Sequence, residues 1–229
     1  MTNSNTDISN NDMNDLNLAF YEKLGVDPFK ELAIKGGFHS YIDLELAFPY
    51  IKDSKTILEL GAGYGRCLDF FLEKNFNGKL IAVELSKPLL SHLSVKYATE
   101  IQENKIEVIA KDIKTISLSE RADAALWMWS GIIDFAPEEQ ANAIKNIYDS
   151  LNPHGRLIID IPRLGYQTYA QHIDSQHLRF DSPYGPLNCY IPSLKDIQMY
   201  CSFAGFSKII NLDYNTTTEK QRTLYILEK

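Results

Sequence analysis

The sequence predicts an α/β fold built around an open, mostly parallel sheet with helices on both faces. Beyond residue 55, short apolar runs alternate with segments of helical periodicity, a pattern typical of parallel strands joined by crossover helices. A glycine-rich turn links the first apolar run to the first of these helices. With 229 residues and 45% hydrophobic positions, the chain is long enough to bury one sizeable core.

Three regions are expected along the chain. Residues 1–15 are rich in Asn and Asp and too poor in apolar side chains to offset chain entropy, which predicts a disordered tail. Residues 16–51 are aromatic and amphipathic, which predicts two or three short helices that form an N-terminal helical cap. Residues 52–229 form the main domain, with an insertion or lid at about 162–192.

Five apolar runs predict the parallel strands, at residues 56–60, 79–84, 106–110, 122–128 and 156–161. A helix over residues 66–75 carries Leu68, Phe71 and Leu72 on one face, and Ser86 can cap the helix that follows the second strand. Pro137, followed by two glutamates, opens a further helix in the way that helix starts prefer.

The last third of the chain follows a different pattern. Residues 162–192 contain four prolines and many tyrosines and show weak periodicity, which predicts a functional insertion or lid because ordinary loops are shorter. Ser193 and Asp196 form a capping box for a helix that Gly205 ends. Residues 208–214 and 222–228 then predict two strands close enough in sequence to pair as a hairpin.

Composition argues against several classes of partner. The formal net charge is −7, and no window gathers Lys or Arg into a stripe, so neither a nucleic acid nor an anionic membrane surface is the expected partner. Three scattered cysteines are too few for a disulfide framework or a zinc knuckle and fit a reducing compartment. No apolar run is long enough to span a bilayer, and no targeting segment is apparent, so we expect a cytoplasmic protein.

The glycine-rich turn suggests a ligand site. Gly61, Gly63 and Gly65 follow an apolar strand and precede a helix, and glycine lets a backbone approach a ligand closely because it has no Cβ atom. The start of the helix aims free N–H groups and a partial positive charge at the same place, which suits a carboxylate or a phosphate. Taken alone, the turn is a moderately specific signal, since a structural turn that packs strand on helix is the less favoured alternative.

Two acidic residues point to an adenosine compound. Glu84 ends the second strand, 23 residues after Gly61, which is close to the offset at which dinucleotide-binding folds place a carboxylate on ribose hydroxyls. Asp112 follows the third strand, where it can accept from an adenine amino group while the N–H of Ile113 faces a ring nitrogen. Open α/β sheets bind ligands at the carboxyl ends of their strands, where all these groups are expected.

The spacing of the glycines is G-x-G-x-G, with Arg66 where a dinucleotide fold prefers glycine. Together with Glu59 in the preceding strand, Glu84, Asp112 and the Pro153-His154-Gly155 turn, this pattern resembles the class I S-adenosylmethionine-dependent methyltransferases over residues 56–229. The resemblance implies a Rossmann-like methyltransferase fold, with a seven-stranded sheet whose last strand is antiparallel. It also implies S-adenosylmethionine as cofactor and S-adenosylhomocysteine as product.

The resemblance further implies roles for individual residues. The glycine turn and Glu59 would lie at the methionine end of the cofactor, Glu84 at the ribose and Asp112 at the adenine, while Arg66 would either reach the methionine carboxylate or lie on the helix surface. The implied cofactor-binding residues are Glu59, Gly61, Ala62, Gly63, Arg66, Glu84, Leu85, Asp112, Ile113 and Trp129.

The acceptor side is less defined by sequence. Aromatic side chains suit a sulfonium through cation–π attraction, although single aromatic residues are more often core. The candidate substrate-binding residues are Tyr21, Ser130, Tyr166 and Tyr169. Three histidines in the covering segments are candidate proton acceptors, namely His39, His172 and His177, although most histidines outside a motif have no catalytic role. The spacing of His172 and His177 does not favour a metal site.

Missing motifs restrict the acceptor. The Asn-Pro-Pro-Tyr type of motif of base-methylating enzymes, the Pro-Cys pair of cytosine methylation and the Asp-Asn pair of metal-dependent catechol enzymes are all absent. We therefore expect methyl transfer to a small-molecule acceptor by a monomer or homodimer. Two alternatives remain open: a non-catalytic S-adenosylmethionine-binding sensor or partner subunit, and another adenosine-cofactor enzyme on the same fold.

Overall fold

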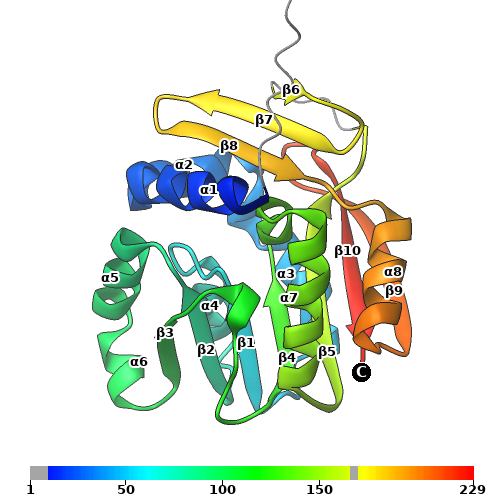
Figure 1. Cartoon of the computed structure of the whole chain (residues 1–229). Coiled ribbons are helices and arrows are strands. Elements are labelled where there is room, and N and C mark those ends of the chain that lie inside the picture. Colours follow the sequence, from blue (N-terminus) through cyan, green and yellow to red (C-terminus); the bar gives the residue numbers. More distant parts are fainter. Residues whose placement is uncertain (1–9, 166–169) are drawn as a thin grey trace, which may run out of the picture.

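The computed structural model describes residues 10–165 and 170–229, and its centre is a seven-stranded sheet (Figure 1). Strands β1 to β5 run parallel, and β10 pairs antiparallel with both of its neighbours. The predicted fold class is therefore confirmed. In order across the sheet, the strands are β3 (Ile106–Ala110), β2 (Lys79–Glu84), β1 (Thr56–Leu60), β4 (Ala122–Trp127), β5 (Leu151–Pro162), β10 (Gln221–Glu228) and β9 (Lys208–Asn215).

Helices cover both faces of this sheet, and each face has its own hydrophobic core. Helices α7 (Pro137–Ser150) and α8 (Leu194–Ala204) pack on one face, where Trp127 and Tyr200 are fully buried. Helix α4 (Arg66–Glu73) packs on the other, where Phe70 and Phe71 are fully buried. Two further helices, α5 (Lys87–Lys96) and α6 (Ala98–Gln102), connect β2 to β3. None of the described helices is both long and apolar enough to cross a membrane.

Short helices precede the sheet, as predicted, but the first one begins earlier than expected. The segment contains α1 (Asn10–Leu24), α2 (Val26–Gly36), η1 (Phe38–Ser40), α3 (Ile42–Ala47) and η2 (Phe48–Tyr50). Residues 10–15 of the expected tail belong to α1, and the buried side chain of Met13 accounts for this extension. Residues 1–9 lie outside the described residues.

The segment expected to form an insertion or lid contains a second, antiparallel sheet. Its strands are β6 (Gln171–His172), β7 (His177–Ser182) and β8 (Gly185–Tyr190). The sequence shows weak periodicity here because most residues of β7 are only partly buried, so apolar and polar positions do not alternate cleanly. Figure 1 shows α1, α2 and β7–β8 lying across one end of the large sheet, and we call these four elements the roof.

Asn17 fastens the roof to the main domain. This fully buried side chain donates from Nδ2 to the backbone oxygens of Asn188 (2.7 Å) and Asp134 (3.1 Å), and its Oδ1 accepts from the Asn188 N–H (2.9 Å). It thereby joins α1, β8 and the 3₁₀ turn η4 (Gly131–Asp134) that follows β4. From α7, Gln140 donates to the backbone oxygens of Ile132 and Tyr190 (3.0 Å each), which holds η4 and β8 from the other side.

Ser86 occupies the first cap position of α5 but does not act as the predicted side-chain cap. Its Oγ is buried and has no hydrogen-bond partner in the part of the chain that the structure describes, and its backbone N–H donates instead to the carboxylate of Glu84. Glu84 ends the preceding strand, and its carboxylate binds the N–H groups of Leu85 and Ser86, which lie just before the first turn of α5.

We expect Asn17→Ala to lower the free energy of unfolding by about 2–3 kcal/mol, because it leaves two buried backbone groups of β8 without partners. Asn14→Ala, one turn earlier on α1, is the matched control and should cost less than about 1 kcal/mol. Urea unfolding followed by circular dichroism measures both changes. Equal losses in the two variants would show that Asn17 does not fasten the roof.

Candidate functional site

A pocket of about 330 Å³ lies between the carboxyl ends of the central strands and the roof. Its floor comes from the segments after β1, β2, β3 and β4, and its cover comes from α1, α2, β7 and β8. All the residues that the sequence resemblance implied for cofactor binding line this pocket: Glu59, Gly61, Ala62, Gly63, Arg66, Glu84, Leu85, Asp112, Ile113 and Trp129.

The glycine turn has a backbone that other residues would not adopt easily. The φ angles of Gly61, Gly63 and Gly65 are 71°, 58° and 87°. A Cβ atom on Gly63 would lie 2.8 Å from the ring of Phe29, and one on Gly65 would lie 2.4 Å from the hydroxyl of Tyr97. At Gly61 the same position has no protein atom closer than 3.9 Å, so this part of the turn is open toward the pocket.

Glu84 is buried and held by three backbone donors. Its Oε1 accepts from the N–H groups of Leu85 and Ser86, and its Oε2 accepts from the N–H of Gly63, each at 2.8 Å. Burial raises the pKa of Glu84, and the three donors oppose that rise by stabilising the charged form. Since a carboxylate has about four acceptor positions, about one remains for a ligand hydroxyl.

Asp112 lies at the end of the next strand. Its Oδ1 accepts from the backbone N–H of Lys114 at 2.8 Å, which fixes the 3₁₀ turn η3 (Ile113–Thr115), and its side chain is partly exposed. Ile113 is the residue nearest to the open side of Gly61. The structure thus brings together groups that lie on three neighbouring strands.

Two polar atoms in the pocket wall have no partner among the described residues. One is Oε2 of Glu59, and the other is the indole nitrogen of Trp127, both buried. Burial raises the pKa of Glu59 to about 7, while the Cys67 thiol and Arg66 oppose that rise. Because an unpaired buried polar atom is costly, these two atoms are candidates for ligand contacts. Sequence reasoning missed Trp127, whose only signal is its position at the end of a buried strand.

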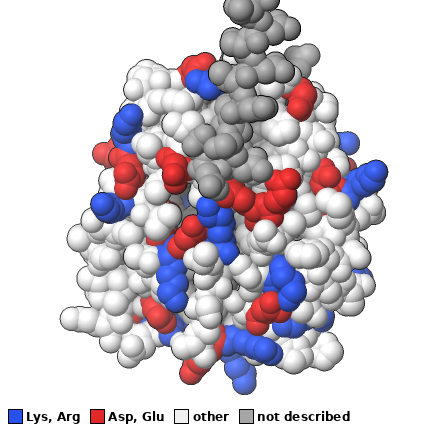
Figure 2. Space-filling view, viewed as in Figure 1, with Lys and Arg blue, Asp and Glu red and all other residues white. Residues whose placement is uncertain are grey.

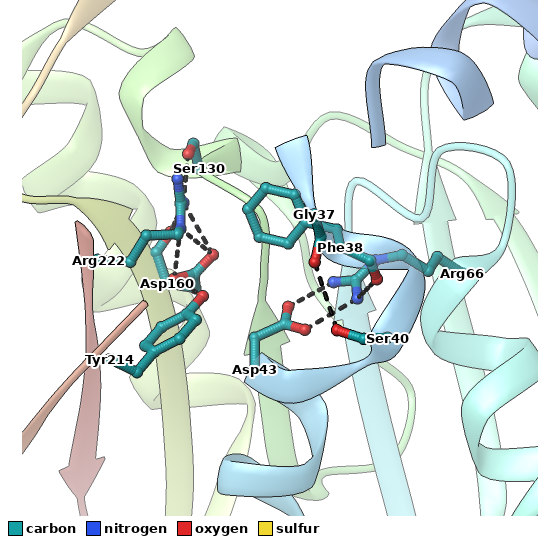
Figure 3. A network of polar contacts seen from close by, with 9 residues as sticks. All are labelled: Gly37, Phe38, Ser40, Asp43, Arg66, Ser130, Asp160, Tyr214 and Arg222. Atoms are coloured by element: carbon teal, nitrogen blue, oxygen red, sulfur yellow. Dashed lines mark hydrogen bonds and ion pairs between the residues drawn. The ribbon is translucent and has the colours of Figure 1, made fainter. Parts of the chain in front are cut away.

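Arg66 is buried, which corrects the option of a surface arginine on the helix. Its guanidinium donates to both carboxylate oxygens of Asp43 and, at 3.1 Å, to the backbone oxygen of Phe38 (Figure 3). The positive charge of Arg66 is therefore paired with α3, although the side chain still lines the pocket. Burial lowers the pKa of Arg66, but the attraction to Asp43 outweighs it and raises that pKa, so the guanidinium stays charged.

A second buried ion pair lies on the other side of Phe38 (Figure 3). Arg222 of β10 donates from Nη2 to Oδ2 of Asp160 at 2.8 Å and also to the Ser130 hydroxyl, and the Tyr214 hydroxyl donates to Asp160 at 2.8 Å. The Phe38 ring centre lies 4.9 Å from the Arg222 guanidinium carbon and 5.4 Å from that of Arg66. This network holds Ser130, whose φ angle is 70°, in the turn after β4.

Beneath the roof, aromatic rings lead from the turn after β4 to α1. Trp129 stacks on Phe29 with ring centroids 4.8 Å apart, and Phe29 lies 5.5 Å from Tyr21. The Tyr21 hydroxyl donates to Oδ2 of Asp134 at 2.8 Å. Burial raises the pKa of Asp134 to about 7, and the hydrogen bond from Tyr21 opposes that rise. Sequence reasoning missed Asp134 because no motif marks it.

The three candidate histidines do not line this pocket. His39 and His172 are exposed, and His177 pairs through Nδ1 with Asp174 at 2.7 Å on the small sheet. No residue of η1 or β6 lines the pocket, and from β7 the lining residue is Phe180 rather than His177. Of the four substrate-binding candidates, Tyr21 and Ser130 line the pocket, whereas Tyr166 and Tyr169 lie outside the described residues.

Comparison with known proteins confirms the resemblance seen in the sequence. Residues 57–155 match the family model described as "Methyltransferase domain". The 1,6-didemethyltoxoflavin-N1-methyltransferase of Burkholderia thailandensis, solved with its substrate and S-adenosylhomocysteine, is 14% identical and covers 96% of this chain and 90% of its own, with a TM-score of 0.72. CalS10, an amino pentose methyltransferase of Micromonospora echinaspora solved with S-adenosylmethionine, is 14% identical, covers 87% and 96%, and has a TM-score of 0.61.

Similar curated sequences are the carboxy-S-adenosyl-L-methionine synthases of two Shewanella species. The protein of Shewanella piezotolerans is 26% identical over 141 residues, which are 59% of this chain and 56% of the relative. The protein of Shewanella loihica is 24% identical over 135 residues, which are 57% and 54%. The chain thus matches about half the length of these curated relatives. Taken together, the comparisons establish the fold of class I S-adenosylmethionine-dependent methyltransferases.

We expect Glu59→Gln to change how stability depends on pH. The Glu59 carboxyl titrates near 4.5 when unfolded and near 7 when folded, so the folded state holds a proton that the unfolded chain has lost between these values. With respect to Glu59, the folded state is most stable below about pH 4.5, where the carboxyl is protonated, and it loses stability as the pH rises toward 7. Glu59→Gln should therefore match the wild type at pH 4.5 and exceed it at pH 8, by on the order of 2–3 kcal/mol.

Chemical unfolding of both proteins across this pH range tests that expectation, with Glu107→Gln on exposed β3 as control. The control should shift stability equally at both ends of the range. A constant difference between Glu59→Gln and the wild type would mean that Glu59 is not held in a desolvated place.

We expect Asp160→Ala to cost about 3–5 kcal/mol, because it leaves the buried Arg222 without its partner. Replacing both residues by Leu and Met should recover most of this loss. Asp213→Ala removes an exposed ion pair with Arg163 and should cost less than about 1 kcal/mol. Denaturant midpoints measure all three, and a double variant as unstable as Asp160→Ala would contradict the role assigned to this ion pair.

Proposed function

We propose that this chain is an S-adenosylmethionine-dependent methyltransferase that methylates a small molecule bound beneath the roof. The observation that carries the proposal is the convergence of Glu59, Glu84, Asp112 and the glycine turn on one pocket. These groups come from different strands, and each has the chemistry that one part of the cofactor needs. The same pocket continues under α1 and the small sheet, which leaves a place for an acceptor.

The residues of the pocket fit the cofactor from end to end. Glu84 would accept from a ribose hydroxyl through its remaining acceptor position, and Asp112 would accept from the adenine amino group. The unpaired Oε2 of Glu59 would receive the ammonium of the methionine part, whose positive charge favours the ionised carboxylate. When bound, S-adenosylmethionine supplies a methyl group already activated by a sulfonium.

The chain itself then has to align the reactants and exclude water. Trp129 and Phe29 present stacked aromatic faces in the pocket, which attract a positive charge. Asn17 and Gln140 hold the roof and η4 together, so the acceptor side is largely formed in advance. A preformed pocket lowers the entropic cost of binding.

The curated relatives are named carboxy-S-adenosyl-L-methionine synthases, but the charges of this pocket favour methyl transfer over a function that uses a carboxylated ligand. The N–H groups of the glycine turn suit the methionine carboxylate, but a second ligand carboxylate needs a further basic partner. Arg66 is already paired with Asp43, and the Lys111 ammonium donates to the Ser117 backbone oxygen at 2.9 Å. On the face of the molecule seen in Figure 2, Lys and Arg lie scattered among Asp and Glu and form no basic stripe. This charge pattern also supports a small-molecule acceptor.

We expect S-adenosylhomocysteine at about 100 times its dissociation constant to raise the melting temperature by about 5–10 °C. NAD at the same concentration should leave the melting temperature unchanged. A shift with NAD and none with S-adenosylhomocysteine would favour another adenosine-cofactor enzyme on this fold.

We expect Glu84→Ala to weaken the binding of S-adenosylhomocysteine by about 1–3 kcal/mol, roughly 5- to 150-fold, because a charge-assisted hydrogen bond to the ribose is lost. Glu107→Ala, on the exposed part of β3, should leave the affinity unchanged. Isothermal titration calorimetry measures both. Equal affinities in the two variants would refute the role given to Glu84.

Transfer of a labelled methyl group separates an enzyme from a sensor. The protein is incubated with trideuteromethyl-labelled S-adenosylmethionine and an extract of small metabolites, and mass spectrometry searches for labelled products. An enzyme should yield a labelled product that a heat-inactivated sample does not. Tight cofactor binding with no labelled product would favour the non-catalytic alternative.

A further inference from the structure

The acceptor side of the pocket contains a single charged group among the described residues that line it from α1, η4, β7 and β8. That group is Asp134, the last residue of η4. The surrounding wall is apolar or uncharged, with Phe180, Leu187 and Cys189 from the small sheet and Phe20 from α1. Burying a lone carboxylate in such a wall costs free energy, which suggests that Asp134 has a functional role.

Asp134 is held in place by its backbone and by one side chain. Its backbone oxygen accepts from Asn17, and the adjacent residues of η4 are held by Gln140. Its Oδ2 accepts from Tyr21, which lies one turn after Asn17 on the same face of α1. Within residues 10–165 and 170–229, no hydrogen bond to Oδ1 is found, so this oxygen is available to a ligand in the pocket.

Among the titratable groups that face Asp134, Asp134 itself is the one suited to accept a proton. Tyr21 from α1 donates a hydrogen bond to it, Cys189 from β8 interacts with it electrostatically, and Glu84 from β2 acts on Tyr21. Burial raises the pKa of Tyr21 and of Cys189 well above their usual values, so both stay neutral. Glu59, whose pKa is also about 7, lies beside the glycine turn, so on the side of the pocket beneath the roof Asp134, with a pKa raised to about 7, is the group that exchanges a proton near neutral pH.

We propose that Asp134 binds the nitrogen of an amine acceptor through Oδ1 and takes its proton before methyl transfer, with Tyr21 as a positioning residue that holds Oδ2. This inference rests on the methyltransferase function proposed above. A cationic amine fits because the carboxylate is the one charge on this side of the pocket, whereas an anionic acceptor would be repelled. The aromatic wall suits an amine attached to an aromatic group.

The proton transfer also has a physical reason. An ammonium has no lone pair and would be repelled by the sulfonium, so it must lose a proton first. One N–H bond breaks, its electron pair stays on nitrogen, and the proton binds Oδ1 of Asp134. The nitrogen lone pair then forms the bond to the methyl carbon, while the electron pair of the broken carbon–sulfur bond stays on sulfur. The products are a methylated ammonium and a neutral thioether, and Asp134 returns its proton to water.

The binding step can be tested with simple probes and without turnover. Phenethylamine, the neutral 2-phenylethanol and the anionic 3-phenylpropionate are titrated by calorimetry into protein saturated with S-adenosylhomocysteine at pH 8. The amine should bind at least about 10-fold more tightly than the alcohol, and the acid should bind more weakly than either. Asp134→Asn should abolish the preference for the amine, whereas Asp181→Asn, on exposed β7, should retain it.

The dependence on pH gives a second readout that a purely structural role would not move. As pH falls below about 7, Asp134 becomes protonated and the affinity for phenethylamine should fall by up to about 10-fold per pH unit. Tyr21→Phe removes a hydrogen bond that stabilises the charged carboxylate, so the pH at which affinity is lost should move upward. Affinity for 2-phenylethanol should not depend on pH in either protein.

The transfer step is tested with trideuteromethyl-labelled S-adenosylmethionine and phenethylamine. Asp134→Asn should lower the rate of labelled N-methyl product at least about 100-fold, with unchanged affinity for S-adenosylhomocysteine. Failure to bind S-adenosylhomocysteine would overturn the proposed function as a whole. If S-adenosylhomocysteine binds normally, three results would each overturn only the assignment of Asp134. They are equal affinity for the amine and the alcohol, no labelled amine, and full activity of Asp134→Asn.

Discussion

The site depends first on the hydrogen bonds of the Glu84 carboxylate. By accepting from Gly63, Leu85 and Ser86, it ties the glycine turn after β1 to the end of β2 and the start of α5. A buried carboxylate would be costly without such donors. Its bond to the Gly63 N–H adds to the bonds that the N–H groups of Gly61 and Ala62 donate to the Val83 oxygen. The interaction therefore fixes the backbone before any ligand arrives and leaves part of the carboxylate for that ligand.

Buried charge organises the rest of the pocket in the same way. The pairs Arg66–Asp43 and Arg222–Asp160 lie on either side of Phe38 and hold α3 and the turn after β4 (Figure 3). Because each guanidinium has a carboxylate partner, Arg66 lines the pocket and Arg222 supports Ser130 without either adding an unpaired positive charge. What remains unpaired on the acceptor side is the negative charge of Asp134, and its surroundings favour a cationic or uncharged acceptor.

The sequence predicted those features that depend on residues close together in the chain. Strand order along the chain, the glycine turn, Glu84 and Asp112 all follow from short-range spacing, and these residues line one pocket. The partners of Asp43, Asp134 and Asp160 were not predictable, because 23 to 113 residues separate each carboxylate from the side chain that binds it. Spacing carries no signal for such pairs. The three histidines show the opposite case. Their side chains could accept a proton, but none of them lines the pocket.

The central claim is that one pocket binds an S-adenosyl compound across the ends of β1, β2 and β3. A crystal structure of the protein with S-adenosylhomocysteine tests it most directly. The account predicts a ribose hydroxyl on Glu84, the adenine amino group on Asp112 and the amino-acid end beside Gly61 and Glu59. Electron density for the ligand elsewhere, or a pocket filled by the chain's own side chains at saturating ligand, would contradict it.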